Sequence, residues 1–413
     1  MNVKNTGFSQ VHRVKDAIEI LLQNSRAITT FEEISVVNSL DRIIFGIIKS
    51  DINLPGFRRS AMDGYAVKAK DTHGASENNP INLKIIGISE IGSNEVFNYQ
   101  KGTCVRISTG APVSAEWDAV VKIEDVEVIN DNQIEILNSV NVGRNIARED
   151  EDVRKNEILY HGGEIIKPWD IALLTAIGIQ TIKVFTKPKI ASISTGNELI
   201  SQAEKLTPGL VYDSNRPAIN AWLSKYPVDL VHTDSILDNP EIIKDRLYNL
   251  IDSTDLIITT GGTSVGTKDY MAEVINSLGE IWVHGIAIRP GKPVIIGKLT
   301  NTTSSTIIIS LPGYPLAAFI NFQLFVITLL NYWTKISDPW IEYTNIKITH
   351  SIPSKAGTRD FVRLKDVNGQ AELIRITGAG ILSSFTKADY LLEVPEDIEG
   401  YAAGQIVQVR KLR

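Results

Sequence analysis

The stretch that decides the fold is TTGGTSVGTKD, residues 259–269, which directly follows the apolar run Leu256–Ile258. A strand that breaks into a glycine turn and continues as a helix is a phosphate-binding arrangement, because backbone N–H groups converge on an anion at the helix start. The glycines can adopt positive φ without a Cβ clash, and the hydroxyl groups add donors. The residues of this loop that we expect to bind a ligand are Gly261, Gly262, Thr263, Ser264 and Gly266.

The loop does not match a Walker A sequence. That sequence requires GxxxxGK[ST], whereas Thr267 and Lys268 follow Gly266, so the nucleotide-triphosphatase pattern is missed. Asp269 comes next, where a metal-bound or substrate-orienting carboxylate would face the anion. Taken alone, the same residues are also compatible with an ordinary turn that binds nothing. The neighbouring segments favour a ligand site.

Residues 187–333 alternate between short runs of β-branched residues and helical segments. This pattern predicts a mostly parallel sheet in a three-layer α/β domain. Ligands of such sheets bind at the carboxyl ends of the strands, which meet along one edge. Four glycine turns occupy those ends: STGNEL (194–199), TTGGTSVG (259–266), RPGKP (289–293) and LPGYP (311–315).

The rest of the chain predicts three further parts, so the fold class is α/β plus β in a multidomain chain. Residues 1–50 and 146–186 are expected to form a discontinuous N-terminal or linker domain, mostly helical at first, because Thr30 and Glu33 fit a capping box. Short β-branched runs between turn residues make 51–145 an inserted β domain. Alternation by twos over 334–413 is consistent with a small β barrel or a sandwich, and we expect a C-terminal β barrel.

Composition restricts the function classes. The chain of 413 residues has 42 basic and 48 acidic residues without a basic block, which argues against nucleic-acid binding. Cys104 is the only cysteine, so an intrachain disulfide is excluded and a reducing compartment is expected. The start of the sequence lacks signal-peptide features. The apolar stretch Leu316–Leu330 is short for a membrane span and carries Asn321 and Gln323, so we expect a buried helix, no membrane partner and a cytoplasmic protein.

Charged residues next to the glycine turns indicate an anion site. Arg289 and Lys292 place two cations around a Pro-Gly turn, where they could bind phosphate or another oxyanion. The carboxylates of Glu198, Asp238 and Asp269 could hold Mg²⁺ against a phosphorylated ligand. Taken singly, the cations could be solvated surface charges and the carboxylates helix caps.

Three segments of the β region and its flank could also belong to a binding site: RRSAMDGYAV (58–67), ISTGAPV (107–113) and REDEDV (148–153). Small residues, an aspartate and a glycine suit a tight loop that faces a ligand. A structural turn before a strand would have the same composition.

Together these segments resemble the MoeA family, the molybdopterin molybdenumtransferases, and are also similar to the E domain of gephyrin. The resemblance covers essentially the whole chain. The motifs occur in the family's order: SAMDGYA (60–66), RISTGAP (106–112), DAVVKIED (118–125), STGNEL (194–199), YDSNR (212–216), GGTSVGTKD (261–269), RPGKP (289–293), LPGYP (311–315) and GTRDFVR (357–363).

The resemblance implies a four-domain homodimer that inserts molybdate into adenylylated molybdopterin with Mg²⁺ and releases AMP. The SAMDGYA domain of one subunit would cover the pterin-binding cleft of the other. Carried over by motif, the catalytic residues would be Asp63, Thr109, Asp152, Glu198, Asp238 and Asp269, and Glu198, Asp238 and Asp269 would contact the metal. The cleft would be lined by Arg289, Lys292, Pro312 and Pro315. Further partners would be the molybdopterin adenylyltransferase and the apoenzymes that accept the cofactor.

Five positions depart from the family's usual pattern: Arg58, Arg59, Asn197, Arg289 and Tyr314. None of them removes an expected catalytic carboxylate, but they make tungstate a plausible alternative to molybdate. Two rival functions are considered. An adenylyltransferase that makes the adenylylated pterin would be a much shorter chain without SAMDGYA. A non-catalytic scaffold or pterin-binding protein would not require the retained carboxylates.

Overall fold

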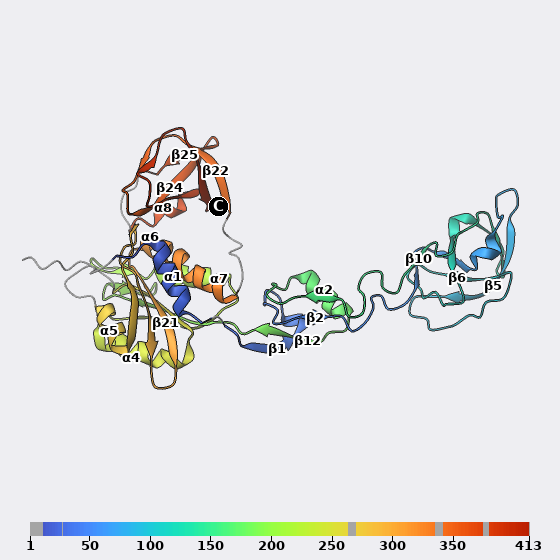
Figure 1. Ribbon diagram of the computed structural model, residues 1–413, viewed down its shortest axis with the longest axis horizontal. Coiled ribbons are helices and arrows are strands. Elements are labelled where there is room, and N and C mark those ends of the chain that lie inside the picture. Colours follow the sequence, from blue (N-terminus) through green and yellow to red (C-terminus); the bar gives the residue numbers. More distant parts are fainter. Residues whose placement is uncertain (1–10, 27, 263–269, 335–341, 375–379, 413) are drawn as a thin grey trace, which may run out of the picture. The chain divides into compact units, whose positions relative to one another are not determined.

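The computed structural model describes residues 11–26, 28–262, 270–334, 342–374 and 380–412. The chain divides into two compact units (Figure 1). The first comprises Met1–Glu32, Asp41–Ile43 and Val184–Arg413, and the second comprises Glu33–Leu40 and Ile44–Lys183.

A six-stranded sheet with the order β16-β13-β17-β21-β20-β18 forms the centre of the first unit. The first four strands are parallel, and β20 and β18 continue the sheet in antiparallel pairing. The sequence prediction of a mostly parallel sheet is confirmed. The strands are β13 (Lys189–Thr195), β16 (Asp229–Ile236), β17 (Leu256–Thr260), β18 (Gly279–His284), β20 (Ile295–Thr300) and β21 (Ser305–Leu311).

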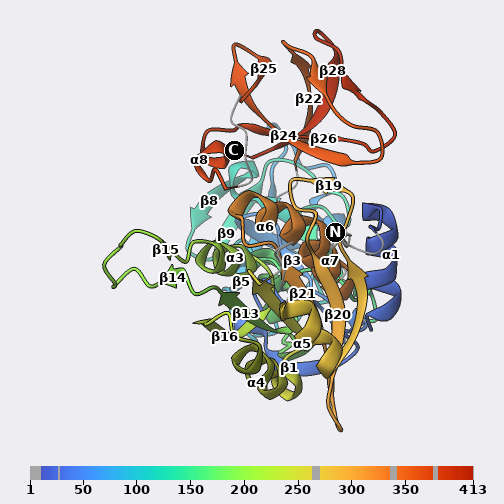
Figure 2. The same ribbon diagram turned by 90° about the vertical axis from the view of Figure 1, so that its left-hand side faces the viewer.

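Helices cover both faces of this sheet, which gives the expected three layers (Figure 2). Strand residues alternate between two cores because successive side chains point to opposite faces. Leu256 and Ile258 contribute to one core, and Ile257 contributes to the other. The first core is covered by α1 (Val14–Asn24), α3 (Asn215–Leu223), α6 (Pro315–Asn321) and α7 (Thr328–Thr334), and the second by α4 (Pro240–Leu250) and α5 (Tyr270–Leu278).

The apolar segment Pro315–Thr334 is long and apolar enough to be a candidate membrane span by composition, but the structure buries it. It runs through α6, the π-helical segment η5 (Phe322–Ile327) and α7. Phe322 and Phe325 are fully buried in the core of the first unit. The prediction of a buried core helix is confirmed.

The C-terminal region is a closed five-stranded barrel, also as predicted. The strands pair in the ring β24-β25-β22-β28-β26, and β26 pairs back to β24. A short strand of the α/β region, β19 (Ile288–Arg289), adds to this barrel in parallel to β24. The barrel strands are β22 (Tyr343–Ile348), β24 (Arg359–Val367), β25 (Gln370–Leu373), β26 (Tyr390–Val394) and β28 (Ile406–Lys411).

The second unit contains the predicted β domain, a six-stranded sheet with the order β7-β4-β6-β5-β9-β8. Its core includes Tyr65 and Val67, which alternate with residues of a second small cluster. The strands are β4 (Gly64–Val67), β5 (Ile81–Ser89), β6 (Thr103–Ile107), β7 (Ala119–Lys122), β8 (Val126–Asn130) and β9 (Gln133–Ile136).

The expectation that residues 1–50 are mostly helical is wrong after α1. Residues Phe31–Ser35 form strand β1, which pairs with β12 (Thr181–Phe185). Glu33 does not close a capping box but accepts a hydrogen bond from Thr181 Oγ1 at 2.5 Å. Pairing with a segment almost 150 positions away decides the structure here, and the local pattern does not carry that information. A short helix, α2 (Pro168–Ala176), lies between β11 (Ile158–Tyr160) and β12.

Candidate functional site

The candidate site is built by strand register. In the parallel sheet Thr195 of β13 lies opposite Ile236 of β16, and Thr260 of β17 lies opposite Leu311 of β21. The four strands therefore end at the same edge. The loops that follow them contain Gly196–Glu198, Asp238, Gly261–Gly262 and Pro312–Tyr314. As predicted, residues far apart in the sequence are brought together.

The loop after β17 depends on its two glycines. Gly261 and Gly262 have φ of 96° and 69°, in the left-handed region that favours glycine. A Cβ at Gly261 would lie 2.1 Å from the Thr195 carbonyl oxygen, and one at Gly262 would lie 3.0 Å from Thr195 Oγ1. The Thr195 hydroxyl is buried and has no hydrogen-bond partner in the described part of the chain. The glycines thus allow two loops to approach closely at a polar position.

Carboxylates flank this approach. A Cβ at Gly262 would lie 3.5 Å from Asp238 Oδ1, so Asp238 lies beside the glycine loop. The Asp238 backbone N–H donates to Asn197 Oδ1 at 3.1 Å. Glu198 is exposed on the same loop as Asn197. The departure at Asn197 therefore has a local role, since its neutral side chain holds the Asp238 loop without adding a negative charge.

A polar network around Asp213 connects the loops at the sheet edge. Ser194 Oγ donates to Asp213 Oδ1 at 3.0 Å, and Arg216 Nε donates to the other oxygen at 2.7 Å. Asn215 Nδ2 donates to the Gly313 carbonyl at 2.7 Å, which connects this segment to the loop after β21. Sequence reasoning noted the motif YDSNR but gave these residues no role. A polar motif directly before a helix was the only available signal.

The RPGKP loop is held at two positions by contacts with different parts of the first unit. The exposed guanidinium of Arg289 donates to the buried carboxylate of Asp360 in the barrel. A Cβ at Gly291 would lie 2.3 Å from Asn321 Nδ2, which donates to the Gly291 carbonyl at 2.9 Å. Lys292, the residue directly after Gly291, is exposed.

The LPGYP loop carries the two predicted cleft prolines, Pro312 and Pro315. Pro315 is the first residue of α6, where a missing N–H costs nothing. Gly313 approaches Gly261, since a Cβ at Gly313 would lie 3.5 Å from the Gly261 Cα. Tyr314 is 66% exposed, so the substitution at this position places a large aromatic side chain at the surface of the site.

The β-domain residues form a second, separate cluster in the second unit. The Thr109 N–H donates to Asp63 Oδ1 at 2.8 Å, so the structure brings SAMDGYA and ISTGAP together. Asp152 is exposed on the segment that pairs with Leu54. Arg58 donates to the Trp117 carbonyl at 2.9 Å, and Arg59 lies in the short strand β3 (Arg59–Ser60). Arg58 and Arg59, which both differ from the family's usual pattern, therefore have contacts within their own domain.

Several predicted residues lie outside the described part of the chain: Thr263, Ser264, Gly266 and Asp269. Among the residues that the structure does describe, no group of three or more His, Cys, Asp or Glu side chains is close enough to hold a metal ion. At the sheet edge, Glu198 and Asp238 are the described carboxylates from the predicted metal set.

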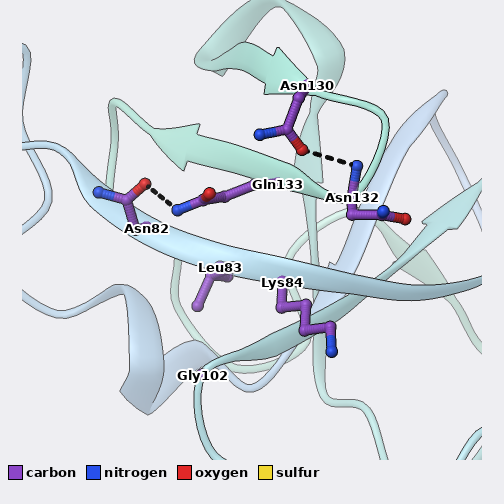
Figure 3. Close-up of a pocket in the computed structure, with 7 residues that line it drawn as sticks. All are labelled: Asn82, Leu83, Lys84, Gly102, Asn130, Asn132 and Gln133. Atoms are coloured by element: carbon purple, nitrogen blue, oxygen red, sulfur yellow. Dashed lines mark hydrogen bonds between the residues drawn. The ribbon is translucent and has the colours of Figure 1, made fainter.

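Two hollows are lined by residues outside the strand-end loops. One, of about 400 Å³ in the β domain, is lined mainly by amide side chains (Figure 3). There Gln133 Nε2 donates to Asn82 Oδ1 at 2.9 Å, and the Asn132 N–H donates to Asn130 Oδ1 at 3.0 Å. The other, of about 450 Å³, lies between η5 and the barrel, where Arg410 donates to Gln323. Neither contains a predicted site residue.

Comparisons with known proteins agree with this architecture. Three family models match: "MoeA N-terminal region (domain I and II)" over residues 12–178, "Probable molybdopterin binding domain" over 191–332, and "MoeA C-terminal region (domain IV)" over 345–412. A molybdopterin molybdenumtransferase 2 of Mycobacterium tuberculosis is 31% identical, with 89% of this chain and 91% of the relative covered. A molybdopterin biosynthesis protein of Methanocaldococcus jannaschii is 34% identical over 92% of each chain.

A solved structure of a MoeA protein from Pyrococcus horikoshii superimposes with a TM-score of 0.85 and 34% identity, covering 98% of this chain and 100% of that one. The fold is therefore that of a multidomain transferase with a doubly wound central domain. The chain belongs to the MoeA family of molybdenum cofactor biosynthesis.

The close approach at Gly261 can be tested against a matched glycine. Gly261→Ala adds left-handed strain of about 1–2 kcal/mol and a clash with Thr195 that we expect to cost a further ~1–3 kcal/mol. Gly209 has a similar φ of 91° but no atom within 4 Å of its Cβ position, so Gly209→Ala should show the strain alone. Urea unfolding of both variants measures the difference. Equal losses of unfolding free energy would contradict the close approach.

Proposed function

We propose that the chain inserts molybdate into adenylylated molybdopterin and releases AMP, in a reaction that depends on Mg²⁺. One observation carries the proposal: register places the glycine loop after β17 beside Asp238 and Gly313 at one sheet edge. A glycine loop suits a phosphate, and a carboxylate beside a phosphate requires a cation between them. The relatives named as molybdopterin molybdenumtransferases support this substrate class.

The described residues fit Mg²⁺ in chemical type. Near the Cβ position of Gly262 lie the hydroxyl oxygen of Thr195 and a carboxylate oxygen of Asp238, and both are hard oxygen ligands. Mg²⁺ usually takes one or two protein carboxylates and completes its shell with water and substrate phosphate. Asp238 and Glu198, with Asp269, would hold it. When bound, the cation would neutralise charge on the adenylate phosphate.

In this proposal the protein's own residues contribute mainly position and charge. The backbone of Gly261 and Gly262 would hold the pterin phosphate, and the exposed Lys292 would attract the incoming oxyanion. No nucleophilic side chain is needed, because oriented reactants and fixed charges can supply the rate enhancement. The hydrogen bonds of Asp213 to Ser194 and Arg216 would help to hold the loops in place.

We further propose that the site is shared in a homodimer, with the Asp63–Thr109 cluster of one subunit reaching the sheet edge of the other. The motif correspondence supports this arrangement. Asp63 is exposed, and its carboxylate orients the Thr109 loop through the 2.8 Å hydrogen bond, so the cluster is preformed and accessible. Asp152 would lie in the same region. The adenylyltransferase and cofactor-accepting apoenzymes would be transient partners in the cytoplasm.

The choice of metal oxyanion is part of the proposal. Molybdate and tungstate have the same charge and shape. Asn197 and Tyr314 lie in loops of the sheet edge, and Arg289 ends β19 at the start of the RPGKP loop. We expect molybdate to be used, with tungstate accepted at a lower rate.

Asp238→Asn should lower the rate of cofactor formation by about 100-fold, since it removes a charge that positions the cation and phosphate. The measurement is cofactor formation from adenylylated molybdopterin, molybdate and Mg²⁺, with AMP release followed in parallel. Asp234→Asn is the matched control, because Asp234 lies on β16, the strand that leads into the Asp238 loop, and its carboxylate pairs with Arg246 at 2.6 Å. Similar rates for Asp238→Asn and the wild type would rule out a role of this carboxylate in the reaction.

Subunit mixing tests the shared site. A heterodimer of an Asp63→Ala chain and an Asp238→Ala chain would retain one intact composite site, because the two changes fall on opposite halves of the other site. Mixing should restore up to about half of the wild-type activity per active dimer. Subunit exchange is verified first by mass spectrometry of differently tagged chains. Activity that stays at the level of the separate variants after exchange would show that each chain carries its own complete site.

A further inference from the structure

We propose that Asp360, a carboxylate of the C-terminal barrel, is a positioning residue of the transferase site that acts through Arg289. The inference rests on the proposed function, since Arg289 begins the RPGKP loop at which the oxyanion is expected. It assigns the barrel a part in the reaction. Asp360 belongs to the motif GTRDFVR (357–363) of the barrel.

The backbone places the two residues together. Strand β19 pairs in parallel with β24, and the register puts Arg289 opposite Asp360. The pairing continues from Ala287, whose carbonyl accepts the Arg359 N–H at 2.9 Å. Two neighbouring strands fix the spacing of their residues, so the ion pair between Arg289 and Asp360 is set by the fold as well as by side-chain attraction.

The environment of Asp360 is unusual for a structural ion pair. Its side chain is 3% exposed, whereas that of Arg289 is 61% exposed. Ser354 Oγ donates to Asp360 Oδ2 at 2.6 Å, and Oδ1 is buried without a hydrogen-bond partner in the described part of the chain. A buried carboxylate costs desolvation energy, and an apolar residue of similar size would often be at least as stable. The carboxylate is therefore better explained by what it holds than by stability.

What it holds is the first residue of the RPGKP loop. The other side of the loop is fixed by Asn321, which donates to the carbonyls of Gly291 and Ala317 at 2.9 and 2.8 Å. Lys292 lies directly after Gly291, and its carbonyl accepts the Ile286 N–H at 3.0 Å. Because Arg289, Gly291 and the Lys292 backbone are all held by these contacts, the direction in which the Lys292 side chain projects is restricted.

The carboxylate also changes what Arg289 can do. An unpaired guanidinium in this place would bind an oxyanion strongly in the ground state, and such binding alone does not accelerate a reaction. Paired with Asp360, Arg289 keeps its position but loses most of its attraction for a free anion. A second loop of the site also contacts the C-terminal region, because a Cβ at Gly380 would lie 3.3 Å from Tyr314 Cδ1.

The test is a double-mutant cycle of Asp360→Asn and Arg289→Met in the full-length protein. The readouts are kcat, the KM for molybdate, and the Kd for molybdate alone from calorimetry. Asp360→Asn should lower kcat about 10-fold while tightening molybdate binding several-fold, because the released guanidinium now binds the anion. In the Arg289→Met background, Asp360→Asn should change neither quantity by more than about 2-fold.

Two controls keep the test decisive. Glu393→Gln removes a carboxylate that pairs with Arg359 at 2.8 Å in the same barrel, and it should leave the kcat and the Kd unchanged. Ser354→Ala removes a hydrogen bond to Asp360 without removing the charge of the carboxylate. It should show the same effects as Asp360→Asn, but smaller, and it replaces Asp360→Asn in the test if that variant does not fold. Effects of Asp360→Asn that persist with Met at 289, or unchanged molybdate affinity, would overturn the inference. An inactive wild type would contradict the proposed function, while the calorimetric cycle would still test the role of Asp360.

Discussion

The register of four parallel strands is the constraint on which the rest of the site depends. Because β13, β16, β17 and β21 end level with one another, their loops must share one sheet edge, although the first and the last of these loops are more than 100 positions apart in the chain. The two cores fix this register, since a shift of one residue would move each isoleucine of β17 to the opposite face. The relative positions of the strand-end loops are therefore determined by apolar packing in the two cores.

Close approaches of the backbone then position the loops at the sheet edge. Gly261 can approach Thr195 only because it lacks a Cβ, and Gly291 approaches Asn321 for the same reason. Fixed polar contacts then orient the charges: Asn197 holds the Asp238 loop, and the barrel holds Arg289 through Asp360. A preorganised set of donors and charges of this kind can stabilise the charge of bound oxyanions.

The sequence was informative where periodicity or glycine chemistry determines the structure. Alternating strands and helices predicted the three layers, the alternation by twos predicted a barrel or a sandwich, and the glycine turns indicated the sheet edge that carries the candidate site. It failed after α1, where the capping-box pattern of Thr30 and Glu33 did not lead to a helix because Phe31–Ser35 pairs with β12. It also could not show that Arg289 faces Asp360, since this contact depends on how a short strand joins a barrel formed 70 positions later.

The most direct test of the account is calorimetric binding of adenylylated molybdopterin with and without Mg²⁺, in the absence of molybdate. If the carboxylates at the strand ends hold the cation against the phosphate, Mg²⁺ should tighten binding to the wild type by about 10-fold or more, and this gain should disappear in Asp238→Asn. Binding that is equally strong with and without Mg²⁺ in the wild type, or a gain that survives in Asp238→Asn, would contradict the claim that the sheet edge is a cation-dependent phosphate site.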